Sequence, residues 1–194
     1  KDRPEIYWID PEERGVLPLD RFHCPRSLRK VVRRGAFEIR IDADFVGVVD
    51  GCAEISEARK DSWINPHIRD LYVALYEMGY AHSVEAWRDG ALVGGLYGVA
   101  LGGAFFGESM FSRARDSSKT ALVHLIARLR KGGFTLLDTQ FTTTHLEGFG
   151  AELIPRADYR ARLAEAVELP ARFDAPIDGP DLEAVMRGAP DQLS

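Results

Sequence analysis

The chain has 194 residues, of which 45% are hydrophobic and 28% charged, and its formal net charge is −5 at pH 7. These values are ordinary for a globular protein with one large or two small domains. They exclude a surface that is basic throughout, although a few well-placed cations would suffice for a local nucleic-acid site.

The sequence shows neither a metal-ligand spacing of cysteines nor a membrane-spanning segment. Cys24 and Cys52 have no metal-ligand spacing, which predicts free thiols, a reducing cytoplasm and no metal. No apolar run is long enough to span a bilayer, so we expect no membrane partner.

Helices and strands are predicted in a mixed order. After an irregular or short-strand segment at 7–19, we expect helices at 25–34, 44–53, 65–78, 119–130, 144–148 and 156–166, with Ser117 and Ser118 capping the fourth. Strands are expected at 37–41, 82–87, 92–99, 105–111, 134–139 and 152–154. The Pro-, Asp- and Gly-rich segment 170–194 is typical of a loosely attached tail, with one short helix at 181–187.

Five cations share one face of the first predicted helix. They follow the i, i+3, i+4, i+7, i+8 series and are Arg26, Arg29, Lys30, Arg33 and Arg34. Like charges on one face repel, and a phosphate backbone would relieve that repulsion. The alternative is a solvated face whose cations pair with acids from elsewhere in the fold.

Glycines interrupt the apolar strands at 92–99 and 105–111. Gly94, Gly95, Gly98 and Gly107 occupy positions where glycine usually marks a bulge or a close approach of backbone or ligand. Each alone is consistent with a twisted sheet, whereas the whole pattern favours a substrate cleft. Glu108 comes directly after Gly107. Because burying an unpaired carboxylate in an apolar strand is costly, Glu108 needs a partner or a function.

Asp138 and Gln140 end a buried strand and are two residues apart. Side chains at this spacing point to the same face of a strand. The carboxylate can hold an attacking ammonium group, and the amide can orient a nucleophile or stabilise charge.

Several segments together resemble one enzyme family. They are GGLYGVALGGAFFGESMFSR at 94–113, LLDTQ at 136–140, THLEGFGAELIPR at 144–156 and HSVEAW at 82–87. This chain closely resembles the leucyl/phenylalanyl-tRNA–protein transferases, from about residue 7 to about residue 163. The resemblance implies an α+β protein, with a GNAT (acetyltransferase-like) domain at 63–169 behind a smaller α+β domain at 1–62. The chain begins without Met, and we expect that domain to lack its first segment.

The resemblance also implies an activity. Enzymes of this family move Leu or Phe, and Met is a further candidate, from aminoacyl-tRNA to proteins beginning with Arg or Lys, which marks them for N-end rule degradation. No cofactor is implied, because the activated ester supplies the driving force. We expect a cytoplasmic monomer.

Site residues follow from the same resemblance. The D-x-Q pair maps onto Asp138 and Gln140 as catalytic residues, and Glu108 lines the cleft, where it could anchor an α-amino group or a basic acceptor side chain. The alternative for Glu108 is a structural ion pair with Arg113 or Arg115. Trp8 and Trp63 would surround the terminal adenosine, with packing between domains as the alternative. The positions implied for an apolar pocket are Leu96, Phe105, Gly107 and Leu125.

Two rival functions remain at this point. A GNAT acyltransferase using acyl-CoA would need glycines before the long helix to approach a pyrophosphate, and 112–118 (SRARDSS) has none. A non-catalytic RNA-binding module would use the basic helix face but leaves Glu108, Asp138 and Gln140 without a role.

Overall fold

The computed structural model describes residues 10–54 and 62–188, and seven strands in this part form one sheet with the order β2-β3-β4-β5-β6-β1-β7. Neighbouring strands are antiparallel except β5 and β6, which are parallel. The strands are β1 (Glu13–Val16), β2 (Glu38–Ile41), β3 (Ala81–Arg88), β4 (Ala91–Leu101), β5 (Ala104–Ser112), β6 (Leu136–Gln140) and β7 (Glu152–Pro155).

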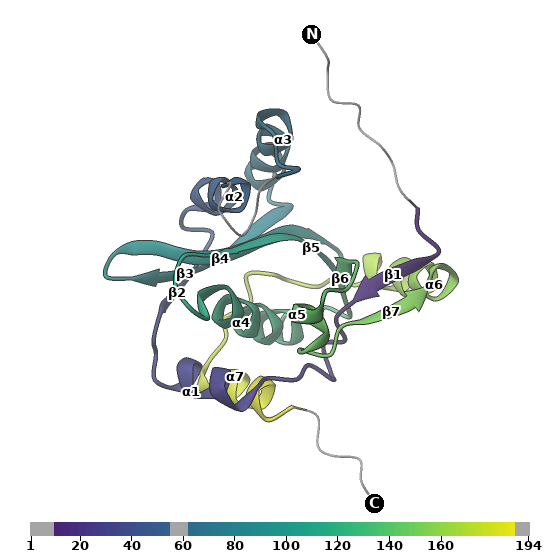
Figure 1. Ribbon diagram of the computed structural model, residues 1–194. Helices are drawn as coiled ribbons and strands as arrows, with labels where there is room; N and C mark the ends of the chain where they lie inside the picture. The colour runs from purple at the N-terminus through teal and green to yellow at the C-terminus, as the bar shows by residue number, and fades with distance from the viewer. Residues whose placement is uncertain (1–9, 55–61, 189–194) are drawn as a thin grey trace, which may run out of the picture.

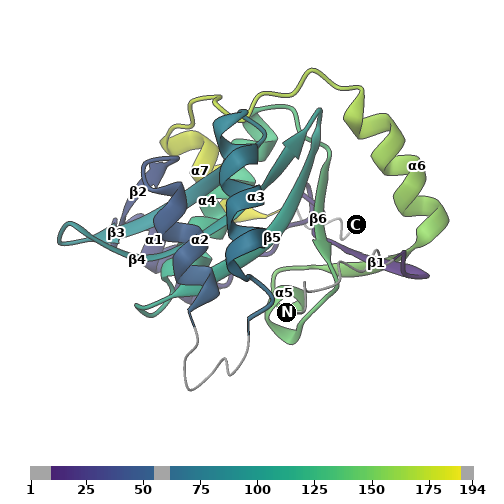
Figure 2. The ribbon, with the colours of Figure 1, turned by 90° about the horizontal axis from the view of Figure 1, so that it is seen from above.

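Helices cover both faces of this sheet (Figures 1 and 2). One face carries α2 (Phe45–Ala53) and α3 (Pro66–Glu77), and the other carries α4 (Ser117–Lys131) with α1 (Arg26–Arg33) and α7 (Gly179–Arg187) beyond it. The short α5 (Thr144–Glu147) follows β6, and α6 (Arg156–Val167) lies beside β1 and β7. The predicted α+β class is confirmed, and the expected elements occur with bounds shifted by a few residues. No helix in the described ranges combines the length and apolar character needed to cross a bilayer.

The start of α4 differs from the prediction. Ser117 and Ser118 are inside the helix, and the N-cap is Asp116 in a left-handed conformation (φ 65°) without a side-chain capping bond. The Ser117 hydroxyl instead donates to the carbonyl oxygen of Val93 on β4 at 2.9 Å. A Cβ on Gly94 would lie 2.1 Å from that hydroxyl oxygen, so glycine is required here for the helix to approach the strand.

The two predicted domains contribute to one sheet and one core. β1 and β2, from the first 62 residues, pair with β6, β7 and β3. The largest hydrophobic cluster likewise joins Leu17 and Phe22 to Leu96 and Ile126 from the later part of the chain. The domain boundaries near residues 62 and 169 stay predictions.

The described part of the expected tail is packed, which corrects the loose attachment predicted for 170–194. Phe173 is 5% exposed and stacks on His82 and Phe105, with ring centroids 4.2 and 5.4 Å apart. Val185 and Met186 of α7 are buried in the same cluster. The Pro, Asp and Gly content suggested a loose tail, but Phe173, Val185 and Met186 are buried, and Ile177 and Leu182 pack against the same cluster.

Truncating Phe173 to Ala should therefore destabilise the whole protein, by about 3 kcal/mol, because a buried aromatic ring leaves a cavity. Urea unfolding followed by fluorescence measures the change. The control is Asp174→Asn, since Asp174 forms a solvent-exposed pair with Arg172 and its loss should leave the unfolding midpoint almost unchanged. Equal stability of the two variants would contradict the packed tail.

Candidate active site

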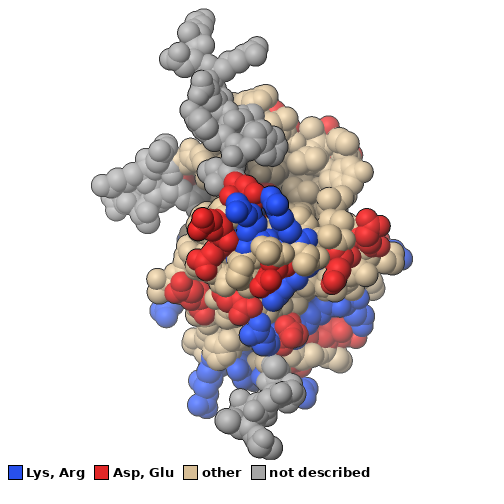
Figure 3. Space-filling view, turned by 90° about the vertical axis from the view of Figure 1, so that its right-hand side faces the viewer, with Lys and Arg blue, Asp and Glu red and all other residues tan. Residues whose placement is uncertain are grey.

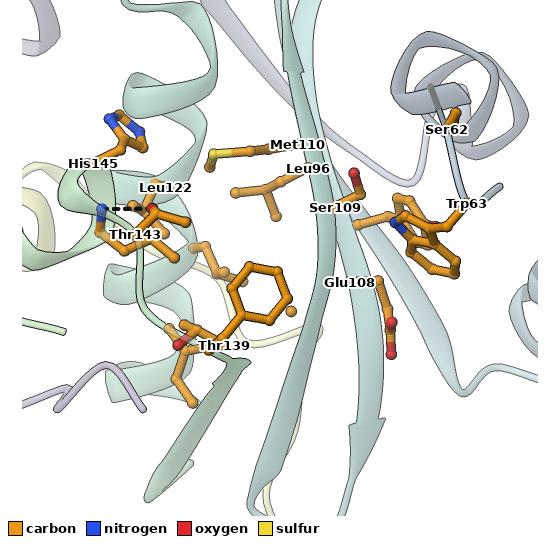
Figure 4. Close-up of a pocket in the computed structure, with 16 residues that line it drawn as sticks. Ser62, Trp63, Leu96, Glu108, Ser109, Met110, Leu122, Thr139, Thr143 and His145 are labelled. Carbon is orange, nitrogen blue, oxygen red and sulfur yellow. Dashed lines mark hydrogen bonds between the residues drawn. The ribbon is translucent and has the colours of Figure 1, made fainter. Parts of the chain in front are cut away.

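A cavity of about 380 Å³ opens where β5 and β6 separate. The two parallel strands pair only over Ala104–Phe106 and Leu136–Asp138. Beyond these residues β5 continues beside β4 while β6 ends, and the gap is lined by side chains of both strands together with α4 and α5. Figure 4 shows Glu108, Ser109 and Trp63 on one side of the strands and Leu96, Met110 and Leu122 on the other.

The α4 side of the cavity is apolar. Leu96, Met110, Leu122, Leu125 and Leu137 line it, so two of the predicted pocket residues, Leu96 and Leu125, are in the wall. An apolar side chain, aliphatic or aromatic, is the ligand group that such a wall would accept.

Phe105 does not line the cavity, in contrast to the prediction. Its side chain is fully buried and stacks on Phe173 in the main core. Strand alternation directs it to the face covered by α4, where it packs against Phe134 and Phe173 and does not reach the cavity. Gly107 does line the cavity, as predicted.

Three of the four strand glycines make room for protein rather than for substrate. A Cβ on Gly98 would lie 2.3 Å from the carbonyl oxygen of Phe106, one on Gly95 would lie 3.0 Å from that of Val84, and Gly94 accommodates Ser117. The expectation that the whole glycine pattern marks a cleft is therefore wrong for these positions, which the twisted sheet explains.

A β-bulge places Glu108 in the cavity wall. Tyr97 opposes Ser109 and Gly98 opposes Gly107, so Glu108 is the extra residue on β5. Its carboxylate accepts a hydrogen bond from the side-chain amide of Gln140 at 3.0 Å, and the Tyr72 hydroxyl also bonds to it. Burial raises the pKa of Glu108, although both hydrogen bonds favour the charged form.

The alternative partners of Glu108 are engaged elsewhere. Arg113 pairs with Glu54, and Arg115 approaches only its neighbour Asp116, at 3.6 Å. Glu108 is also the one acidic residue among the described residues that line the cavity. A carboxylate in this position favours a cationic ligand group.

Asp138 lies behind the cavity wall and is fully buried. The guanidinium group of Arg14 donates to both carboxylate oxygens, at 3.0 and 3.1 Å, and the Tyr159 hydroxyl donates at 2.5 Å. The backbone N–H of Gln140 donates at 2.6 Å. The carboxylate thus has no free edge for an ammonium group, so the expected direct contact with the nucleophile is not what the structure shows.

Gln140 turns away from Asp138 and faces the site. Its φ of 65° ends the extended strand, so the two side chains do not run parallel as alternation predicted. Its side-chain amide donates to Glu108, and its Oε1 makes no hydrogen bond to any described residue. Thr139 lines the cavity, and its buried hydroxyl likewise has no partner in the described part of the chain.

Exposed aromatic rings lie at the cavity. Trp63 is 51% exposed and packs edge-on against Tyr72, with ring centroids 6.2 Å apart, and Phe141 is 62% exposed. Trp8, which was predicted to act with Trp63, lies outside the described residues.

The five predicted cations of α1 differ in how they are bonded. Arg33 forms a two-pronged pair with Glu183 of α7, at 2.8 and 2.9 Å, and Arg29 donates to the carbonyl oxygen of Cys24 at 2.7 Å. Arg26, Lys30 and Arg34 have no carboxylate partner within the described ranges. Pairing with an acid from elsewhere in the fold therefore holds for Arg33, and contact of this face with a phosphate backbone stays a prediction.

Within the described residues, several cations on the face formed by β1, β7 and α6 are paired with acids, in contrast to three of the five on α1. Its Lys, Arg, Asp and Glu side chains are interspersed (Figure 3), with Asp10 paired to Arg156 and Arg160, and Arg21 paired to Glu152. Cations neutralised in this way are poor sites for a polyanion.

Sequence reasoning missed three residues of the site: Arg14, Tyr72 and Tyr159. Arg14 is 124 positions from Asp138, and no local pattern links them. Only the cost of burying an unpaired carboxylate indicates that some cation must be present. Within residues 10–54 and 62–188, no three His, Cys, Asp or Glu side chains are placed to hold a metal ion.

A family model described as "Leucyl/phenylalanyl-tRNA protein transferase" matches residues 16–164, which is more than half of the chain. The chain belongs to this family. It is 61% identical over 175 residues to a leucyl/phenylalanyl-tRNA–protein transferase of Maricaulis maris, covering 90% of this chain and 81% of that protein. It is 58% identical over 174 residues to the protein of the same name from Paramagnetospirillum magneticum, covering 90% and 83%.

The match to the leucyl/phenylalanyl-tRNA–protein transferases includes every residue that lines the cavity. It begins after Arg14 and ends before Phe173. The family assignment therefore rests on the region that contains Glu108, Asp138 and Gln140.

Proposed function

We propose that this chain transfers leucine or phenylalanine, with methionine as a further candidate, from aminoacyl-tRNA to proteins that begin with Arg or Lys. The observation that carries the proposal is the apolar cavity with Glu108 in its wall, where the Glu108 carboxylate accepts a hydrogen bond from Gln140. The cavity accepts an apolar side chain, and the carboxylate accepts an ammonium group. Relatives that share about 60% of their residues with this chain are named for the same activity.

Glu108 lines the same cavity as the apolar wall, from the other side of the strands, so one ligand can present an ammonium group to Glu108 and an apolar side chain to the wall. An aminoacyl ester carries both groups. A carboxylate is favoured there because a charge-assisted hydrogen bond is stronger than a neutral one.

The reaction requires the amine of the acceptor to attack the ester carbonyl carbon. A C–N bond forms, the ester C–O bond to the terminal ribose breaks, and the amine proton passes to the departing ribose oxygen. The free Oε1 of Gln140 accepts a hydrogen bond from the attacking amine and directs its lone pair to the carbonyl carbon. The activated ester supplies the free energy, so no cofactor is required.

Asp138 acts in this proposal as a positioning residue. It fixes the backbone of Gln140 through the 2.6 Å hydrogen bond, and Arg14 and Tyr159 hold the carboxylate in place. Burial, reinforced by the bond to Asp138, raises the pKa of Tyr159, so its hydroxyl remains a donor at neutral pH.

The remaining assignments belong to the same proposal. Trp63, together with Trp8, stacks on the terminal adenine, and the α1 cations contact the tRNA backbone. We further propose a GNAT-like arrangement of the sheet, supported by the parallel pair β5 and β6 joined through α4. A cytoplasmic monomer that marks proteins for N-end rule degradation fits this substrate pair.

The acyl-CoA alternative is disfavoured by the start of α4. A pyrophosphate would need to approach the N-terminal N–H groups of this helix closely, and the residues at its start, 112–118 (SRARDSS), include no glycine that would allow this approach.

Transfer of radiolabelled leucine from Leu-tRNA to peptides beginning with Arg, Ala or Asp tests the proposed function. We expect label on the Arg peptide only, because the proposed acceptors begin with Arg or Lys. Binding of tRNA without transfer would instead indicate an RNA-binding module. Label on the Asp peptide would contradict the proposed acceptor.

A further inference from the structure

A hollow outside the active site is lined by three arginines from three separate elements. Arg34 follows α1, Arg88 ends β3, and Arg115 lies in the loop before α4. The hollow has a volume of about 380 Å³, and its other lining residues are Ser27, Val31 and Asp116.

The three arginines of the hollow face a single carboxylate among its described lining residues, that of Asp116. The side chain of Arg115 is 95% exposed and reaches Asp116 only at 3.6 Å, while Asp116 is itself bound by Lys119 at 3.1 Å. Arg34 and Arg88 have no carboxylate partner among the described residues. The guanidinium face of Arg88 rests on the Phe37 ring, 4.4 Å from its centroid, which leaves the N–H edge for another group.

The hollow adjoins the cations of α1 that have no carboxylate partner among the described residues. Arg26 and Lys30 are exposed on the same helix, and the helix rises about 12 Å between positions 26 and 34. Arg33 and Arg29, by contrast, are already bonded to Glu183 and to the Cys24 carbonyl. The unneutralised cations therefore form a track that ends in the hollow, which suits a polyanion better than a single small anion.

We propose that this hollow binds a backbone phosphodiester of the tRNA. Guanidinium groups donate two parallel hydrogen bonds to phosphate oxygens, and three of them converge here with the Ser27 hydroxyl as an additional donor. The inference rests on the proposed function and deepens it, because it adds Arg88 and Arg115 to the tRNA contacts and reduces the part played by Arg33.

The test compares the double variant Arg88→Gln/Arg115→Gln with the unmodified protein and with Arg160→Gln, whose guanidinium is paired to Asp10 on another face. Binding of uncharged leucine tRNA is measured from about 50 to 200 mM salt, together with steady-state leucine transfer. In the double variant we expect Kd and KM to rise about tenfold, kcat to be unchanged, and the salt slope of binding to fall by about 1 to 2. Arg115→Gln alone, at a fully solvated side chain, should show part of this effect without any change in unfolding temperature.

Two results would overturn the inference in distinguishable ways. If the unmodified protein binds tRNA and transfers leucine while the double variant matches Arg160→Gln in Kd and salt slope, the hollow is not a phosphate site and the proposed function stands. If the unmodified protein neither binds tRNA nor transfers leucine, the proposed function fails and the inference fails with it.

Discussion

Replacing Asp138 by Asn is expected to lower kcat/KM for aminoacyl transfer about 100-fold and to reduce the free energy of unfolding by about 3 kcal/mol. Asp138 is fully buried, and the change leaves Arg14 without its anion. The backbone of Gln140 also loses a charge-assisted hydrogen bond, so its amide is less well aligned with the attacking amine. Steady-state transfer assays and urea unfolding measure the two effects.

Two further variants determine how Asp138 acts. Asp10→Asn removes an exposed partner of Arg156 and Arg160 and should cost less than about 1 kcal/mol with normal transfer. Arg14→Gln should lower kcat with little change in KM, because it acts only through the position of Asp138 and Gln140. Normal kcat in folded Arg14→Gln would contradict a positioning role and favour direct binding of the amine by Asp138.

Glu108→Gln is expected to reduce leucine transfer at least tenfold and, at pH 8, to increase the free energy of unfolding. Loss of the carboxylate removes the charge-assisted bond to the substrate ammonium. The effect on stability follows from the raised pKa of Glu108, which burial causes. The native state binds this proton more tightly than the unfolded state, so the ionised carboxylate opposes folding as the pH rises through the native pKa.

The pH dependence distinguishes this effect from a change in packing. Gln cannot ionise, so the stability gain of the variant should be present at pH 8 and vanish below about pH 4, where both states of the parent are protonated. Urea unfolding of both proteins at several pH values measures it. Glu147→Gln, at an exposed position on α5, should change stability by less than about 0.5 kcal/mol. A gain that is the same at every pH would show that packing, not charge, is responsible.

Local patterns in the sequence were sufficient for much of the fold. Apolar runs separated by the turn residues Asp89-Gly90 and Gly102-Gly103 located β3, β4 and β5. Asn65 before Pro66 located the start of α3, where the Asn65 side chain accepts from the backbone of Ile68. These features depend on residues within a few positions of one another, which is why they can be read without a structure. The D-x-Q pair and Glu108 were likewise found from burial cost and spacing.

The partners of those residues could not be found in this way. Asp138 meets Arg14 and Tyr159, and Glu108 meets Tyr72, only because β1, α6 and α3 pack around β5 and β6. Strand alternation also failed at Gln140, where a positive φ turns the side chain to Glu108.

The sequence by itself determined the elements, the family and the residue types of the site. The tertiary structure decided which of those residues face the cavity and which are held behind it: Glu108 and Gln140 line or face the site, Asp138 is held behind the wall, and Phe105 belongs to the core. It also decided which cations of α1 remain free, since Glu183 neutralises Arg33 from a helix 150 residues away. The physical reason is that hydrogen bonds and ion pairs between distant segments depend on how the segments pack, and no local pattern encodes that packing.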